Sequence, residues 1–174
     1  MTHSALVVGA TGIVGQATAR VLARADWPVL GLSRRPLDQA GVTGVVGDLH
    51  DAAALGEVLA NARPSHVYIT TWARQDTEAE NIRVNGAMVR NLLDALRPGG
   101  SVRHVALVTG GNSGIGLGMA DAMAAHGAAV AIWGTNPTKN AAAAEQLRAH
   151  GGRVLDLVCD VGDHDAVIAA TAAT

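Results

Sequence analysis

A short apolar run, a glycine-rich turn and a helical pattern follow one another twice in this chain, and this repeat constrains the fold more than any other feature. A constant offset that aligns Gly9 with Gly110 also aligns Val29 with Val130. We interpret the repeat as two copies of a strand–turn–helix–strand–helix–strand unit. The glycine turns are Gly9-x-x-Gly12-x-x-Gly15 and Gly110-x-x-x-Gly114-x-Gly116, and the third strands lead into Gly47–Asp51 and Cys159–Asp163.

Seven apolar runs, each bounded by turn residues, have the length and composition of buried strands. Helical patterns lie between them, and residues 12–25 and 78–97 each have one apolar face. Asn136-Pro137 is typical of a helix start, and Gly151 is typical of a helix end. Repeated strand–helix–strand units predict an α/β fold with a doubly wound parallel sheet of the Rossmann-like kind. The runs are Ala5–Val8, Val29–Leu32, Val42–Val46, Val67–Thr70, Val102–Thr109, Ala129–Trp133 and Val154–Cys159.

We expect one domain over residues 1–174, made of two half units, 1–104 and 105–174. In a doubly wound sheet the first half orders its strands 3-2-1, and strand 4 lies beside strand 1. If the second copy continues that sheet, its strands (primed) give seven strands in the order 3-2-1-4-1′-2′-3′. All crossovers can then be right-handed.

The first glycine turn has the chemistry of a dinucleotide-binding loop. Glycine permits a tight turn and close backbone approach to a diphosphate, because it has no Cβ. The following helix N-terminus offers unpaired N–H groups and the positive end of its dipole. The alternative is a glycine turn that only packs helix on strand. The predicted contacts of the cofactor here are Gly9, Thr11, Gly12, Ile13, Val14 and Gly15.

The residues after the second strand indicate which nicotinamide cofactor the loop would take. An acidic residue at this position favours NAD, whereas arginine favours the 2′-phosphate of NADP. The first copy has Ser33-Arg34-Arg35 and no acid, which favours NADP(H) over NAD(H). A solvated basic loop is the alternative. The second copy has Gly134-Thr135-Asn136, which favours neither cofactor.

Further candidate contacts lie at the ends of the other strands. Asp48 and Leu49 follow the third strand, where a carboxylate could accept from the adenine amino group; turn capping is the alternative. Thr70, Thr71 and Trp72 follow the fourth strand. We expect the first loop to be the strong site, because two dinucleotides on one sheet would compete near Thr70. The second-copy candidates, whose occupancy stays open, are Gly110, Asn112, Ser113, Gly114, Ile115, Gly116, Asp160 and Val161.

Composition excludes several other classes. The formal charge of −2 gives no reason to expect nucleic acid as a partner, and no apolar run is long enough for a membrane span. A single cysteine, Cys159, and a beginning without a basic leader favour a cytoplasmic protein. The seven histidines lack metal-site spacing. Ser113 is not in a Gly-x-Ser-x-Gly elbow, so no hydrolase is indicated.

With these motifs in hand, both copies resemble short-chain dehydrogenases/reductases. Residues 4–110 resemble the branch of progesterone 5β-reductase and iridoid synthase. The residues that carry this resemblance are Gly9–Gly15, Ser33-Arg34-Arg35, Gly47-Asp48-Leu49, Tyr68–Ala73, Glu80-Asn81 and Asn91-Leu92-Leu93.

Residues 104–174 resemble a different branch, the single-domain 3-oxoacyl and sugar-alcohol reductases. This resemblance rests on the Thr109-Gly110 loop, Trp133–Asn136 and Cys159-Asp160-Val161. The two resemblances meet at Val105–Gly110, which fits the fifth strand of one branch and the first strand of the other. We therefore interpret the chain as a fusion of two half units, which arose through either natural recombination or deliberate design.

The resemblance implies a catalytic tyrosine whose pKa is lowered by a lysine. This chain has one Tyr, Tyr68, and one Lys, Lys139, which we interpret as a strand residue and a solvated helix residue. Asn85 matches an asparagine of the family's active-site helix. We therefore expect an NADP(H)-binding protein with little or no turnover. The alternatives are an active NADP-dependent enone or carbonyl reductase with a nonstandard acid, and a structural chimera without a ligand; a homodimer stays open.

Overall fold

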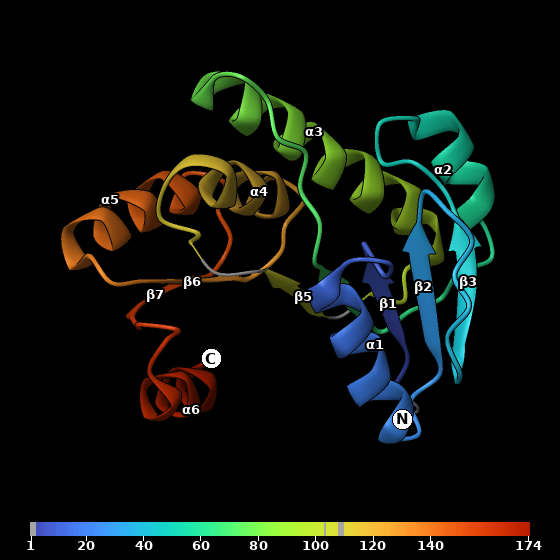
Figure 1. The fold of residues 1–174 in the computed structure, drawn as a ribbon. Helices are drawn as coiled ribbons and strands as arrows, with labels where there is room; N and C mark the ends of the chain where they lie inside the picture. Colours follow the sequence, from blue (N-terminus) through green and yellow to red (C-terminus); the bar gives the residue numbers. More distant parts are fainter. Residues whose placement is uncertain (1–2, 103, 108–109) are drawn as a thin grey trace. The chain divides into compact units, whose positions relative to one another are not determined.

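The computed structural model describes residues 3–102, 104–107 and 110–174, in which strands and helices alternate along the chain except at residues 34–41 (Figure 1). The repeat predicts a helix at this place in the first copy, and this prediction is wrong, because two strands follow one another there without a helix. The predicted α/β class with parallel strands is confirmed. The strands are β1 (Ala5–Val8), β2 (Val29–Ser33), β3 (Val42–Val46), β4 (His66–Ile69), β5 (His104–Leu107), β6 (Val130–Gly134) and β7 (Val154–Val158). The helices are α1 (Ile13–Arg24), α2 (Ala52–Leu59), α3 (Glu78–Leu96), α4 (Gly114–Ala125), α5 (Pro137–Arg148) and α6 (His164–Ala173), with a 3-10 turn at Arg97–Gly99.

The first five strands form one sheet in the order β3-β2-β1-β4-β5, as predicted for that part of the chain. Strand β1 is central and pairs in parallel with both β2 and β4. All four of its residues are buried, which explains why its sequence is a continuous apolar run rather than an alternating one. The carboxyl ends of β1, β2 and β4 therefore lie together at one edge of the sheet.

The predicted single sheet of seven strands is not confirmed. Strands β6 and β7 form a separate two-stranded parallel sheet. Among the described residues, no backbone pairing joins β5 to β6, which is the bond that the predicted order required. The predicted strand Val102–Thr109 is described as a strand only over His104–Leu107; residues 103, 108 and 109 lie outside the described residues.

The chain divides into two compact units. The first unit consists of Met1–Trp72 and Asn91–Ala106, and the second of Ala73–Arg90 and Leu107–Thr174. Helix α3 contributes its first part to the second unit and its last part to the first.

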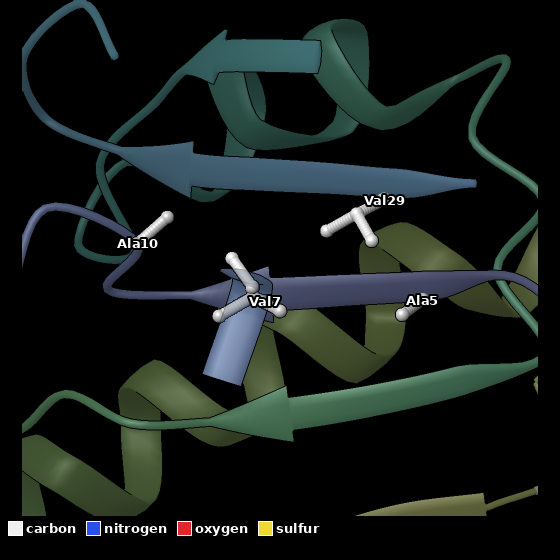
Figure 2. Packing of buried hydrophobic residues seen from close by; sticks show 5 residues of the cluster. Ala5, Val7, Ala10 and Val29 are labelled. Carbon is white, nitrogen blue, oxygen red and sulfur yellow. The ribbon is translucent and has the colours of Figure 1, made fainter. Parts of the chain in front are cut away.

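In the first unit, small side chains allow α1 to pack closely on the sheet. Ala5, Val7, Ala10 and Val29 lie together in one buried cluster (Figure 2), which also includes Ala19 of α1. Successive side chains of a strand face opposite sides, so Val8 and its register partner Leu32 face the other layer. There the side chains of Leu32 and of Leu55 from α2 both lie close to Gly47.

In the second unit, α4 and α5 pack against the β6–β7 sheet. Helix α5 begins as predicted: the Asn136 side chain accepts from the Lys139 N–H at 3.0 Å, and Pro137 is the first helical residue. Gly151 adopts the left-handed conformation just beyond the helix, with φ +82°. The buried residues of these two helices include Met119, Ala120, Met123, Ala143, Ala144 and Leu147.

Candidate dinucleotide site

Gly9 adopts a backbone conformation that other residues rarely adopt. Its φ is +86°, and a Cβ here would lie 2.6 Å from the Cβ of Thr71. The Gly12 N–H donates to the Gly9 carbonyl at 2.9 Å, which closes the turn. Glycine is therefore required at position 9 both for conformation and for space.

Gly15 allows α1 to lie directly against the loop. A Cβ at Gly15 would collide with the Gly9 carbonyl oxygen and would lie 2.8 Å from Thr70 Oγ1. The Thr70 hydroxyl donates to the Val8 carbonyl at 2.7 Å, so the end of β4 is tied to the end of β1. The loop, the helix start and the end of β4 form one packed group.

The N-terminus of α1 is open. The first N–H groups of a helix have no partner within the helix, and Gly12 at the N-cap position has no side chain to offer them. The neighbouring side chains leave the approach free: Thr11 and Val14 are exposed, and Ile13 is 92% exposed. Backbone donors and the helix dipole together suit an anion at this place.

Two arginines lie beside this helix start. The Gly9 N–H donates to the Leu32 carbonyl at 2.9 Å, so β2 ends next to the loop. Ser33 ends β2 and is buried, and Arg34 and Arg35 follow it with exposed side chains. Across the described residues, neither guanidinium has an ion pair or a side-chain hydrogen bond. The pair is free to meet a phosphate at this edge.

The remaining first-copy candidates lie at the same edge with differing availability. One oxygen of the Asp48 carboxylate accepts from the His50 N–H at 3.0 Å, as the turn-capping alternative requires. Leu49 is buried, and its carbonyl accepts from Asn91. Thr70 and Thr71 are half-buried against the loop glycines, whereas Trp72 is exposed.

The second glycine loop repeats the local geometry of the first. Gly110 has φ +94°, Gly114 has φ +53°, and a Cβ at Gly116 would collide with the Gly110 carbonyl oxygen. Helix α4 also starts without a capping side chain, although Ser113 holds the N-cap position and is exposed. Ile115 is half-buried in the first turn.

The second copy differs at the end of β6. The Asn112 amide donates to Asn140 Oδ1 at 2.7 Å, and the Asn140 amide donates to the carbonyls of Gly134 and Leu157, both at 2.9 Å. Gly134 leaves room for both asparagine side chains. Sequence reasoning missed Asn140, which is only 1% exposed. No sequence motif marks it, since its role depends on the neighbouring strand ends.

The acidic residues after β7 resemble those after β3. Asp160 accepts from the Gly162 N–H at 2.9 Å, and Asp163 caps α6 through the N–H groups of Asp165 and Ala166. Val161 between them is half exposed. The Asp160 carboxylate is therefore engaged in a turn, as that of Asp48 is.

The one Tyr and the one Lys of the chain lie in different compact units. Tyr68 lies in β4 of the first unit, where burial raises the pKa of its hydroxyl above the ordinary value. Lys139 lies exposed in the first turn of α5, in the second unit. The family's tyrosine needs a lowered pKa, so the direction at Tyr68 is opposite to what the chemistry requires.

Asn85 is held in a structural network. Its amide group accepts from the Ala73 N–H and donates to the carbonyls of Ala73 and Asn81, each at 2.8 Å. Asn81 holds Gln75 in a similar way. These contacts use the polar atoms of the Asn85 side chain to brace the segment that follows Trp72.

The described part of the chain lacks two further classes of site. It holds no group of three or more His, Cys, Asp or Glu side chains arranged to bind a metal ion. None of its helices combines the length and the apolar character that a membrane crossing needs.

With a parallel sheet, an open glycine loop and a basic strand end in place, comparison with known proteins identifies the family. Residues 5–105 match the NAD dependent epimerase/dehydratase family, and the chain belongs to it. Residues 104–174 match the model for short chain dehydrogenases.

Among individual relatives, the chain is similar to (S)-8-oxocitronellyl enol synthase of Nepeta cataria, with 35% identity over 120 residues that cover 61% of this chain and 30% of the relative. It is also similar to 3-oxo-Delta(4,5)-steroid 5-beta-reductase of Arabidopsis thaliana, with 36% identity over 117 residues and the same coverage. The chain thus spans about 30% of the length of these relatives. Both belong to the branch that residues 4–110 resemble.

A solved structure shares the fold. The Bordetella bronchiseptica enzyme WbmG, determined in complex with NAD, superimposes with a TM-score of 0.60 at 16% identity. The match covers 90% of this chain and 66% of that enzyme.

Proposed function

We propose that the chain binds NADP(H) at the first glycine loop and prefers it to NAD(H). The observation that carries this proposal is the position of Arg34 and Arg35, which are exposed and unpaired among the described residues beside the open N-terminus of α1. A helix N-terminus accounts for the diphosphate, and two guanidiniums account for the additional 2′-phosphate.

The bare backbone of the loop supports this proposal. Where Gly9 and Gly15 stand, a Cβ would meet backbone or the side chains that end β4, so the chain keeps this backbone bare. The N–H groups from Ile13 onward would hold the diphosphate, and Thr71 and Trp72 would border the nicotinamide end. The bound cofactor supplies or accepts a hydride at its nicotinamide ring.

We further propose that these residues bind the cofactor with little or no turnover. Hydride transfer to a carbonyl or enone leaves an oxyanion that needs a proton or a stabilising donor. Tyr68 has a raised pKa, and Lys139 belongs to the other unit. The competing proposal, reduction of an enone or carbonyl with another acid, is favoured by the names of the enol synthase and 5-beta-reductase relatives.

A thermal shift with NADP+, NAD+ and no ligand tests the binding proposal. A ligand at 100 times its Kd stabilises the folded state by about 2.7 kcal/mol. We expect the larger shift with NADP+. Each charge-assisted hydrogen bond contributes roughly 1.5–3 kcal/mol, so replacing both arginines in R34A/R35A should weaken NADP+ binding at least about tenfold.

The double variant R20A/R24A is the matched control. Both arginines are exposed on α1, so the variant removes the same charge away from the end of β2. Equal losses of NADP+ affinity in the two variants would mean that Arg34 and Arg35 act only through overall charge and not through contact with the 2′-phosphate. NADPH oxidation in the presence of small enones, measured at 340 nm, would favour the reductase instead.

A further inference from the structure

We propose that Ser33 is a positioning residue for NADP specificity: its buried hydroxyl holds the turn from which Arg34 and Arg35 reach the 2′-phosphate. This inference rests on the proposed function. It assigns to Ser33 a different role from the cofactor contact that the sequence predicts, because the hydroxyl points into the protein.

The hydroxyl of Ser33 is committed to the backbone. Ser33 is 4% exposed, and its Oγ donates to the Arg35 carbonyl at 2.6 Å. This bond closes a two-residue turn directly after β2. Across the described residues it is also the one hydrogen bond that involves Arg34, Arg35 or Pro36. Without it, the basic turn has no polar contact that fixes its backbone.

The rest of the connection to β3 is held independently. Leu37 packs into the space above two strand glycines, since a Cβ at Gly31 would lie 2.6 Å from Leu37 Cδ2. The Gln39 amide donates to the Gln16 carbonyl on α1 at 3.2 Å, and the Gln39 carbonyl accepts from Val42 at 3.1 Å. Removing the Ser33 hydroxyl should therefore loosen the arginine turn and leave the remainder of the connection in place.

The consequence for binding follows from preorganisation. Arginine side chains lose considerable rotamer freedom when they bind, and a mobile backbone beneath them adds to that loss. Only a ligand with a 2′-phosphate engages these guanidiniums. The Ser33 hydroxyl should therefore affect NADP+ and leave NAD+, which has a free 2′-hydroxyl, almost unchanged.

Calorimetric titration of S33A with NADP+ and with NAD+ tests this role. One hydrogen bond contributes roughly 0.5–1.5 kcal/mol net, so we expect NADP+ affinity to fall about three- to tenfold while NAD+ affinity stays within about twofold. S33C keeps the side-chain volume but is a weak donor, and should behave as S33A does. S33T retains the hydroxyl and should restore the preference. Adenosine 2′,5′-bisphosphate and 5′-AMP, used as fragments, should show the same contrast.

Ser65 provides the matched control. It is also buried, at 8% exposure, and its hydroxyl donates to the Ser4 carbonyl at 2.9 Å, at the opposite edge of the sheet. S65A should leave the ratio of the two affinities unchanged. If S33A weakens NADP+ and NAD+ equally, Ser33 is merely structural and the inference is overturned. If S33A changes neither affinity, the inference is overturned too.

The wild-type titration separates the two proposals. If wild-type protein binds NADP+ no more tightly than NAD+, the proposed preference fails, and the inference about Ser33 fails with it. If wild-type protein prefers NADP+ and S33A keeps the full preference, only the inference about Ser33 fails.

Discussion

Gly15 lies where α1 packs against the first glycine loop, and its missing side chain permits that contact. A Cβ there would collide with the Gly9 carbonyl oxygen. We expect G15A to lower the free energy of unfolding by about 1–3 kcal/mol, as overpacking does, and to abolish nucleotide binding. Urea unfolding and calorimetric titration measure the two effects.

Gly56 offers a matched control for that substitution. It lies within α2, and a Cβ there would meet nothing within 4 Å. G56A should therefore stabilise the protein by about 0.5–1 kcal/mol, because alanine favours a helix over glycine. A G15A protein as stable as G56A, with cofactor binding intact, would contradict the geometry of the loop.

Tyr68 yields a pH prediction because it is the one tyrosine in the sequence. Burial raises the pKa of its hydroxyl in the folded state, so the unfolded chain ionises first as the pH rises. The contribution of Tyr68 to stability is complete below about pH 10 and is lost as the pH rises through the folded-state pKa. Absorbance of the phenolate near 295 nm should have a higher midpoint in folded protein than in urea.

Y68F is the control for this titration and should show no such absorbance change. A folded-state midpoint at or below that of the unfolded chain would contradict the partial burial of Tyr68. It would also remove one reason to deny this residue a role in proton transfer.

The candidate residues of the first loop could be proposed from the sequence because their signals are local. The glycines of one turn and the arginines after one strand lie within short segments, and their chemistry needs no knowledge of distant contacts. The availability of each side chain could not be predicted in this way. Whether Ser33 faces a cofactor or its own turn depends on how β2 ends. Whether Asp48 is available to adenine or caps its own turn depends on its contact with His50.

At the scale of elements, the Asn140 network joins α5 to both strands of the second sheet. Its amide donates to carbonyls of β6 and β7, and its oxygen accepts from Asn112. N140A would remove all three of these hydrogen bonds, although the Gly134 carbonyl would still accept from the Cys159 N–H. We expect the variant to lower the free energy of unfolding by about 3 kcal/mol. Urea unfolding followed by circular dichroism measures this loss.

N136A is the comparison for that variant. Asn136 caps α5 through one exposed hydrogen bond, and losing such a cap costs about 1 kcal/mol. If N140A costs no more than N136A, the buried network contributes little to the second unit.

Most element types and approximate boundaries followed from the sequence, but the helix that the repeat predicts between β2 and β3 is not present. The helix predicted over 78–97 is described over Glu78–Leu96, and the helix predicted over 12–25 is described over Ile13–Arg24. Periodicity and end signals fix such elements locally. The bonding partner of a strand is a different quantity, because pairing joins segments far apart in the chain. The predicted pairing of β5 with β6 therefore stays a prediction.

At the scale of the whole molecule, two family models meet within β5. The epimerase/dehydratase match ends at residue 105, and the short chain dehydrogenase match begins at residue 104. This meeting point supports the predicted fusion of two half units, which stays a prediction. The division into two compact units also falls at Ala106 and Leu107, although it assigns residues 73–90 to the second unit.

The stoichiometry of binding distinguishes the two glycine loops. Only the first loop has arginines after its second strand; in the second copy Asn136 is occupied in capping α5. We expect calorimetry to find one tight equivalent of NADP+ per chain. G116A should leave that equivalent intact, whereas G15A should remove it. Two equal sites, or loss of the tight site in G116A, would contradict this assignment.

The uncapped N-terminus of α1, at Gly12, has a consequence for which substitutions this sequence could accept. Serine in place of Gly12 would give the helix the partner that it lacks, and such a change commonly stabilises a helix end. The hydroxyl would then compete with a diphosphate for the same N–H groups. The stability of the unliganded protein and its affinity for a nucleotide are thus opposed at position 12. Serine there would indicate selection for stability, and glycine would indicate selection for binding.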